Sequence, residues 1–282
     1  MAQIIIKVVL IGFLMQVNFV LADIFRHQDE DGAVSYSDKP SASATKITPA
    51  TKTYRYKYKV KRVYDGDTII LQNGHRVRLL GVNTPEIKSR HRQGEEGGRQ
   101  ATQWLKDKLG TANVFLEYDD EKHDKYQRDL AHLFLDNGEH INLSLIESGL
   151  GMLSIIPPNV RYSKRLQQAE KKAMSQQLGI WGTGSYQAIP NERLLKDKSI
   201  SGWHRFLATP NKVTESRKFI RLIISDKINI RIPKENLNYF PDIGNYIGQS
   251  LEIRGWASRK KDHFSILVRH PSAITILKPS IN

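Results

Sequence analysis

The stretch DGDTIILQNGHRVRLLGVNTPE, residues 65–86, decides the fold class of the chain. Apolar and polar residues alternate in it as they do in half-buried strands, and Asn73-Gly74 between two apolar runs is a strong signal for a tight hairpin turn. The stretch therefore predicts a β-hairpin. It leaves Arg78 to be explained, because an arginine inside a buried strand is costly unless an anion lies beside it.

The composition favours a globular protein with a polyanionic partner. The chain has 282 residues and a formal net charge of +14, from 43 lysines and arginines against 29 aspartates and glutamates. Such a basic chain is suited to bind nucleic acid. With 26% charged and 39% hydrophobic residues it is expected to fold into one large or two modest domains. The absence of cysteine excludes disulfides, zinc thiolate sites and thiol nucleophiles.

Residues 1–22, MAQIIIKVVLIGFLMQVNFVLA, have the pattern of a secretory signal peptide. A lone Lys7 precedes an apolar run, which ends in Val-Leu-Ala, and cleavage is expected after Ala22. The alternative is an uncleaved membrane anchor, but the run from Val8 is short for a bilayer span and contains two amide side chains. The mature chain is therefore expected to have no stable membrane span and to be periplasmic or secreted.

Residues 54–183 show the periodicities of a small strand-rich barrel flanked by three helices. The segment YRYKYKVKRV alternates strictly, which fits a strand entering a barrel, a basic edge that attracts phosphates, or both. Ala101, Leu105 and Leu109 share one face of a predicted helix, and Asn142 is expected to cap a second, short helix.

Residues 199–282 contain four or five strand-like runs, among them KFIRLIISD, INIRIP and FSILVRH, with no helix of any length between them. Short strands at such spacing predict a second small β-barrel. Trp256 is expected to pack in its core. The alternative is a surface that binds single strands, formed by Trp256 with Arg259, Lys260 and Lys261.

Five motifs carry a resemblance to the staphylococcal nuclease (thermonuclease) family: VYDGDTIIL, RVRLLGVNTPE, DKYQRDLAHLFLDNG, INLSLIESGLGML and AEKKAMSQQLGIW. They occur in the family's order and spacing over about residues 58–183. The resemblance implies an OB-type five-stranded barrel with three helices, and calcium-dependent cleavage of DNA and RNA phosphodiesters that leaves 3′-phosphate ends. The segment ending in YSDKP resembles an N-terminal module of exported bacterial proteins, and residues 252–277 resemble the OB-like modules of some secreted nucleases.

The expected fold class is mainly β with helices, and the chain is expected to be a monomer in solution. Its expected parts are a signal peptide at 1–22, a small N-terminal hairpin module at 23–42, a linker at 43–53, the nuclease domain at 54–183, a connector at 184–198 and an OB-like domain at 199–282.

The resemblance assigns catalytic roles to Arg78, Arg128 and Glu86. Attack on a phosphodiester builds negative charge on the equatorial oxygens, and guanidinium groups stabilise that charge with paired hydrogen bonds. Glu86 follows the Thr-Pro step, where a carboxylate could take a proton from the attacking water or orient it. A surface glutamate paired with an arginine is the alternative for Glu86 considered alone.

The resemblance also implies a metal site and a phosphate site. The metal ligands would be the carboxylate of Asp67, the side chain of Asn83 and the backbone carbonyl of Thr84, binding calcium (Ca2+) or another divalent cation. Asn83 departs from the family's usual aspartate, which removes one negative charge and should lower calcium affinity. Lys125 and Tyr126 match positions that contact a terminal phosphate.

The sequence also leads to expectations for Asp65 and Gln127, which lie near the predicted site residues. Asp65 is expected to support the turn that precedes Asp67. Gln127 stands where the family often has glycine, so the path of the loop before Arg128 could differ.

The leading hypothesis is an exported, sugar-nonspecific nuclease that acts on DNA and RNA. One alternative is a catalytically weak or inactive nucleic-acid-binding envelope protein on the same fold, for which Asn83 is the main support. Another is a structural envelope protein held by its N-terminal hairpin. The chain shows no HExxH zinc helix, GxSxG nucleophile elbow or Walker lysine loop, which leaves metal-assisted hydrolysis as the leading chemistry.

Overall fold

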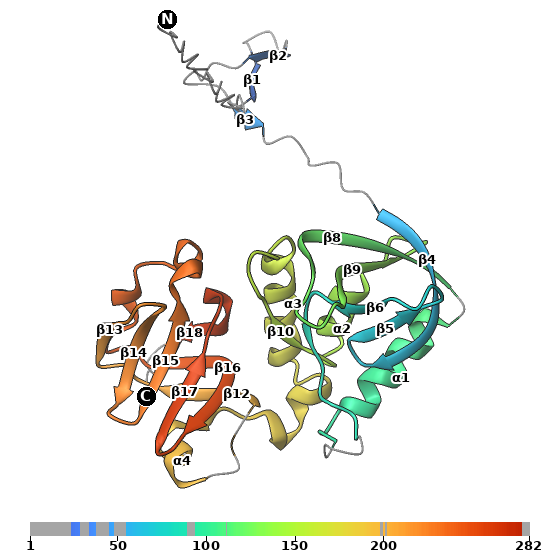
Figure 1. Cartoon of the computed structure of the whole chain (residues 1–282). Helices are drawn as coiled ribbons and strands as arrows, with labels where there is room; N and C mark the ends of the chain where they lie inside the picture. Colours follow the sequence, from blue (N-terminus) through green and yellow to red (C-terminus); the bar gives the residue numbers. More distant parts are fainter. Residues whose placement is uncertain are drawn as a thin grey trace, which may run out of the picture. The chain divides into compact units, whose positions relative to one another are not determined.

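The computed structural model describes residues 24–28, 34–37, 45–47, 55–88, 94–110, 112–197, 200 and 202–277, so the predicted signal peptide lies outside the described residues. The chain divides into two compact units, Met1–Thr53 and Tyr54–Asn282 (Figure 1). In the first unit, β1 (Ile24–Gln28) pairs antiparallel with both β2 (Val34–Ser37) and β3 (Thr45–Ile47). The β1–β2 pair is the arrangement that the expected hairpin requires, whereas β3 lies in the range expected to be a linker.

The second unit begins with a closed barrel whose strands follow the order β4-β5-β6-β9-β8 (Figure 1). Its strands are β4 (Arg55–Asp65), β5 (Thr68–Leu71), β6 (Arg76–Leu79), β8 (Asn113–His123) and β9 (Asp129–Leu135). Neighbouring strands are antiparallel except β6 and β9, which are parallel. The predicted turn joins β5 to β6, and Gly74 has a φ of 90°, which glycine adopts without strain.

Three helices cover this barrel, as predicted: α1 (Gly98–Leu109), α2 (Ile141–Glu147) and α3 (Ser163–Ser175). In addition, β7 (Gly81–Asn83) and β10 (Met152–Ser154) form a separate two-stranded antiparallel sheet. The fully buried side chains of the core come from strands and helices alike, among them Ile69, Leu71, Leu79, Leu105, Leu109, Leu116, Leu133, Ile141, Leu145 and Ile146. The expected barrel with three helices is thus confirmed.

Asn142 does not cap α2, contrary to the expectation, because it lies inside the helix and is fully buried. Its Oδ1 accepts the Leu133 amide hydrogen at 2.9 Å, and its Nδ2 donates to the Leu80 carbonyl at 2.8 Å. A buried amide must find such partners, and this one ties α2 to the barrel strands.

Two short elements follow in the range expected to be a connector, β11 (Ile189–Pro190) and α4 (Asn191–Lys196). Beyond them the strands are β12 (Gly202–Ala208), β13 (Lys212–Glu215), β14 (Phe219–Ser225), β15 (Ile228–Pro233), β16 (Leu251–Lys260), β17 (His263–Leu267) and β18 (Ile274–Ile276). The 3₁₀ turns of this unit are η1 (Gly179–Gly182), η2 (Gly184–Tyr186), η3 (Lys234–Tyr239), η4 (Ile243–Tyr246) and η5 (Pro271–Ala273).

The second β region is present as predicted, but its strand path β11-β12-β16-β17-β15-β14-β13 has two ends, whereas β4, β5, β6, β9 and β8 form a closed barrel. Its own core includes Phe206, Ile253, Ala257 and Phe264. The prediction that Trp256 packs in this core is wrong, because its side chain is 52% exposed. Its strand neighbours Gly255 and Ala257 are buried, and successive side chains of a strand point to opposite faces, so Trp256 points away from the core. Among the described residues, we find no helix with the length and apolar character needed to cross a membrane.

Candidate active site

Arg78 lies beside an anion, the carboxylate of Asp67, as expected for an arginine inside a strand. The arginine lies on β6 opposite Thr68 of β5, and its guanidinium forms an ion pair with the carboxylate of Asp67. Only 17% of the Arg78 side chain is exposed. The charge of Arg78 is therefore compensated by the acid that immediately precedes β5.

Asp67 holds the neighbouring segments around that arginine. Its Oδ2 accepts the Thr84 amide hydrogen at 2.9 Å, and its Oδ1 accepts the Thr68 hydroxyl at 3.1 Å. Arg78 Nη2 in turn donates to Asn83 Oδ1 at 3.1 Å. The structure thus brings together Asp67, Arg78, Asn83 and Thr84, the residues to which the resemblance assigns the metal site and one catalytic arginine.

The turn before Asp67 is packed too tightly for a side chain at its centre. A Cβ added to Gly66 would lie 2.6 Å from Thr84 Oγ1 and 2.7 Å from the Cβ of Ala101 on α1. Asp65 Oδ1 accepts the Asp67 amide hydrogen at 3.2 Å, which is a supporting contact of the kind expected. Burial, followed by the nearby charge of Asp67, raises the pKa of Asp65 to about 6.

Glu86 lies two residues beyond Thr84, at the start of a segment whose residues 89–93 are outside the description. Its amide hydrogen is donated to Glu95 Oε2 at 3.0 Å, and its carbonyl accepts the Glu95 amide hydrogen at 2.8 Å. These contacts fix the backbone at Glu86, and its side chain is partly exposed.

The loop that carries Arg128 is organised by Asp124. Asp124 Oδ1 accepts the amide hydrogens of Tyr126 and Arg128 at 2.8 and 3.0 Å, and its Oδ2 accepts Arg128 Nε–H at 2.8 Å. Burial alone would raise the pKa of Asp124, but the hydrogen bonds from Arg128 outweigh it and lower that pKa. Gln127 has a φ of 59°, the left-handed conformation that glycine adopts most easily. A glutamine in this conformation introduces backbone strain.

Arg78 and Arg128 meet at one pocket of about 520 Å³. The parallel pairing of β6 with β9 explains this, because Arg78 lies opposite Leu130 and Arg128 precedes β9 by one residue. Asn83 and Lys125 also line the pocket. The other predicted residues, Asp67, Thr84, Glu86 and Tyr126, are not part of its lining.

Sequence reasoning missed the residues that the second β region adds to this pocket, namely Trp203, Arg254, Leu267 and Arg269, with Trp256 assigned to the core. A signal was present in the alternation of GWHRFLA and LEIRGWASRK, where Trp and Arg recur at every second position. Such alternation places them on one sheet face, opposite the apolar one.

The predicted metal donors are all oxygen atoms: the carboxylate of Asp67, the amide of Asn83 and the carbonyl of Thr84. Hard oxygen donors with one carboxylate suit a divalent cation that completes its coordination with water and substrate phosphate. No group of three or more His, Cys, Asp and Glu side chains forms a metal site within the described part of the chain. The donor chemistry fits a cation held jointly with substrate.

Comparison with known proteins places this arrangement in a family. The family model described as staphylococcal nuclease homologue matches residues 76–183. Thermonuclease from Staphylococcus intermedius is 42% identical over 127 residues, which cover 44% of this chain and 75% of that protein. Thermonuclease from Staphylococcus hyicus is 37% identical, with the same coverage. Endonuclease YncB from Bacillus subtilis (strain 168) is 33% identical over 130 residues, or 44% of this chain and 61% of YncB. The chain therefore belongs to the staphylococcal nuclease family.

Proposed function

We propose that this protein is a nuclease that hydrolyses phosphodiester bonds of DNA and RNA with the help of a divalent cation, most suitably calcium. The observation that carries the proposal is the meeting of Arg78 and Arg128 at one pocket, with Asn83 beside them. The family model covers residues 76–183, which include Arg78, Asn83 and Arg128, and relatives named thermonuclease and endonuclease match 127 and 130 residues of the chain. Family resemblance adds that the bond to the 5′-oxygen breaks and that 3′-phosphate ends remain.

In this proposal the two arginines stabilise the transition state. Attack of water on phosphorus increases the negative charge on the equatorial oxygens, and planar guanidinium groups meet it with paired hydrogen bonds. Both arginines are oriented before substrate binds, Arg78 by Asp67 and Asn83, and Arg128 by Asp124. Such preorganisation lowers the barrier because little rearrangement is needed as charge develops.

Glu86 is proposed to take the proton from the attacking water or to orient that water. Asp67, Asn83 and the Thr84 carbonyl would hold the cation, which when bound supplies positive charge beside the phosphate. Lys125 and Tyr126 would contact a terminal phosphate; the Lys125 ammonium lies 4.9 Å from the centre of the Tyr126 ring.

The second candidate is a nucleic-acid-binding protein on the same fold with weak or no catalysis. Asn83 favours it, because an amide leaves Asp67 as the only charged ligand in the predicted set. In either case we propose an exported monomer that acts in the periplasm or outside the cell, as residues 1–22 suggest.

The test uses end-labelled DNA and RNA with the mature chain, in calcium or in a chelator, followed by identification of the product ends. Arg128→Ala and Glu86→Gln should each lower turnover about a hundredfold or more, with a smaller effect on affinity. The matched control is the double variant Lys57→Ala/Lys59→Ala on the exposed face of β4, which should weaken binding and spare turnover at saturation. Parent-like cleavage by the Arg128 and Glu86 variants would refute the site, and an inert parent with every cation would favour the binding protein.

A further inference from the structure

The second β region presents an outer sheet face that carries tryptophans and arginines in register. Strands β12 and β16 pair so that Trp203 lies opposite Trp256 and Arg205 opposite Arg254. Because side chains alternate along a strand, these four share one face, while residues such as Ile253 point to the core on the other. The exposure of Trp256 is thus a consequence of register and is built into the sheet.

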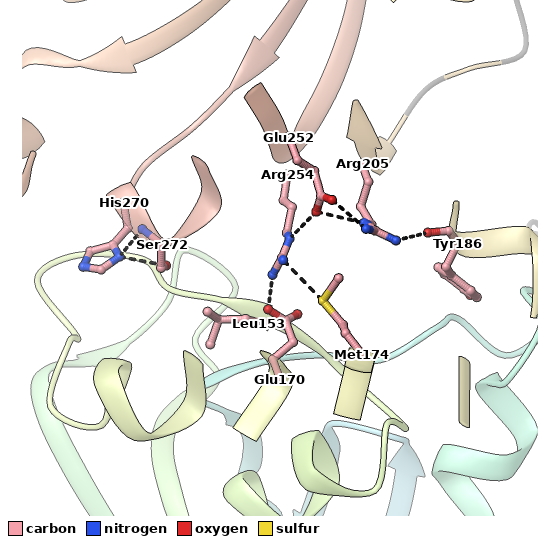
Figure 2. Close-up of polar contacts among 9 residues, drawn as sticks. All are labelled: Leu153, Glu170, Met174, Tyr186, Arg205, Glu252, Arg254, His270 and Ser272. Atoms are coloured by element: carbon pink, nitrogen blue, oxygen red, sulfur yellow. Dashed lines mark hydrogen bonds and ion pairs between the residues drawn. The ribbon is translucent and has the colours of Figure 1, made fainter. Parts of the chain in front are cut away.

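Buried contacts join this face to the barrel's helix α3 (Figure 2). Arg254 forms an ion pair with Glu170, its Nε donates to Glu252 Oε1 at 3.1 Å, and its Nη2 lies 3.4 Å from Met174 Sδ. The side chains of Arg254 and Glu170 are 8% and 0% exposed. Glu170 Oε1 also accepts the Leu153 amide hydrogen at 2.8 Å.

A second arginine extends the same network. Arg205 Nη2 and Nε donate to the two carboxylate oxygens of Glu252 at 2.7 and 3.0 Å, and its Nη1 donates to the Tyr186 carbonyl at 2.8 Å (Figure 2). The carboxylate between Arg205 and Arg254 therefore holds both arginines on the side of the sheet that faces α3. The orientation of this face toward the barrel is set by buried charged groups.

The result is a pocket with two unlike walls. One wall, from the barrel, carries the cations Arg78, Arg128 and Lys125, with the acids Glu121 and Asp124 beside them. The other carries Trp203 and Trp256, followed on β17 by Leu267, which lies opposite Trp256 in the strand register. The side chain of Arg269 joins this second wall. A ligand that fits the pocket offers anionic groups to the arginines and a flat face to the tryptophans.

We propose that this pocket binds an unpaired segment of DNA or RNA, with its phosphates against Arg78 and Arg128 and a base stacked on Trp256. A polynucleotide strand has both required features, phosphates along its backbone and planar bases. The bases of a duplex are stacked on each other and cannot offer a face to the indole, so the second β region selects single-stranded substrate at the cleavage site. This inference rests on the proposed function and names the substrate form.

The test separates stacking from charge. Binding of the full chain is measured by fluorescence anisotropy in a chelator, with a labelled single strand and an abasic strand of equal length and charge. The parent should bind the base-containing strand more tightly. Trp256→Ala should weaken that binding about tenfold, the scale of one lost base stack, and leave the abasic strand unaffected.

Two further variants exclude indirect effects. Trp256→Phe keeps an aromatic face and should retain most of the preference. Ile276→Ala removes an apolar side chain that is 47% exposed in the same sheet but outside the pocket lining, and it should behave as the parent. Circular dichroism verifies that all variants are folded.

Equal binding of both strands by the parent, no binding of either, or an unchanged preference in Trp256→Ala would overturn the inference. Cleavage assays on the same proteins keep it distinct from the proposed function. A parent that cleaves but shows no base preference refutes the inference alone. If the parent prefers the base-containing strand through Trp256 but does not cleave with any of the cations, the inference is supported and the proposed catalysis is refuted.

Discussion

Replacing Arg254 by methionine tests how the second β region is attached to the barrel. The change removes a charge whose side chain is 8% exposed and leaves Glu170, which is fully buried, without its ion-pair partner. Breaking a buried pair in this way costs about 3 to 5 kcal/mol, because the remaining charge keeps its desolvation penalty. Glu252 is less affected, since Arg205 still donates two hydrogen bonds to it.

The opposite change, Glu170→Gln, should be milder. Glutamine retains an oxygen that can accept the Leu153 amide hydrogen, and Arg254 keeps its contact with Glu252. We expect a loss of about 1 to 3 kcal/mol, the range for weakening a buried charged hydrogen bond. The double variant Arg254→Met/Glu170→Gln removes both charges, so it should be more stable than Arg254→Met alone.

The assay is urea unfolding of the full chain, followed by tryptophan fluorescence and by circular dichroism. The predicted order of stability is parent, Glu170→Gln, then Arg254→Met, with recovery in the double variant. A loss below about 1 kcal/mol for Arg254→Met, or strictly additive effects, would show that the pair is not dehydrated and would refute the reasoning.

Three further predictions concern acid, metal and strain. Burial lowers the pKa of His140 to about 4 and that of His132 well below 6.5, so both are neutral in the fold. Below pH 6.5 these histidines gain protons in the unfolded chain before they do so in the fold, so the free energy of unfolding should fall by about 1.4 kcal/mol per histidine and pH unit as the pH drops toward 4. Between pH 7 and 5 the urea midpoint of His140→Gln should therefore shift less than that of the parent. Asn83→Asp adds a carboxylate to the predicted metal site and should tighten calcium binding in titration calorimetry; unchanged affinity would place Asn83 outside that site. Gln127→Gly should relieve the left-handed strain and stabilise the fold by up to about 1 kcal/mol in urea unfolding, whereas Gln127→Ala should not.

The barrel could be predicted from sequence because its signals are local and agree with one another. The turn at Asn73-Gly74, the alternation on either side of it and the acid next to Arg78 all appear within one hairpin. The joining of Arg78 with Arg128 is not local, and only the resemblance to a known family anticipated it. Its physical cause is the parallel pairing of β6 and β9, which no short stretch of sequence reveals.

The errors have a common physical origin in contacts between distant elements. Alternation in β16 places Trp256 on one of two faces, but the sequence does not say which face meets the helices of the barrel. Asn142 has the residue type of a helix cap, yet it forms hydrogen bonds with the buried backbone of Leu80, Ala131 and Leu133 instead. For Gln127 the sequence alone did not indicate the backbone conformation, and only the structure shows the left-handed φ at this position.

The pair formed by Glu170 and Arg254 has a consequence for the assembly of the second sheet. Glu170 lies on α3, more than eighty residues before Arg254 in the chain, and it stays hydrated until β16 packs against that helix. Closure of the second sheet over α3 dehydrates that carboxylate. A slip of β16 by one residue would turn Arg254 to the opposite face and bury Glu170 alone, at a cost of several kcal/mol. The buried charge of Glu170 thus disfavours a sheet assembled in the wrong register.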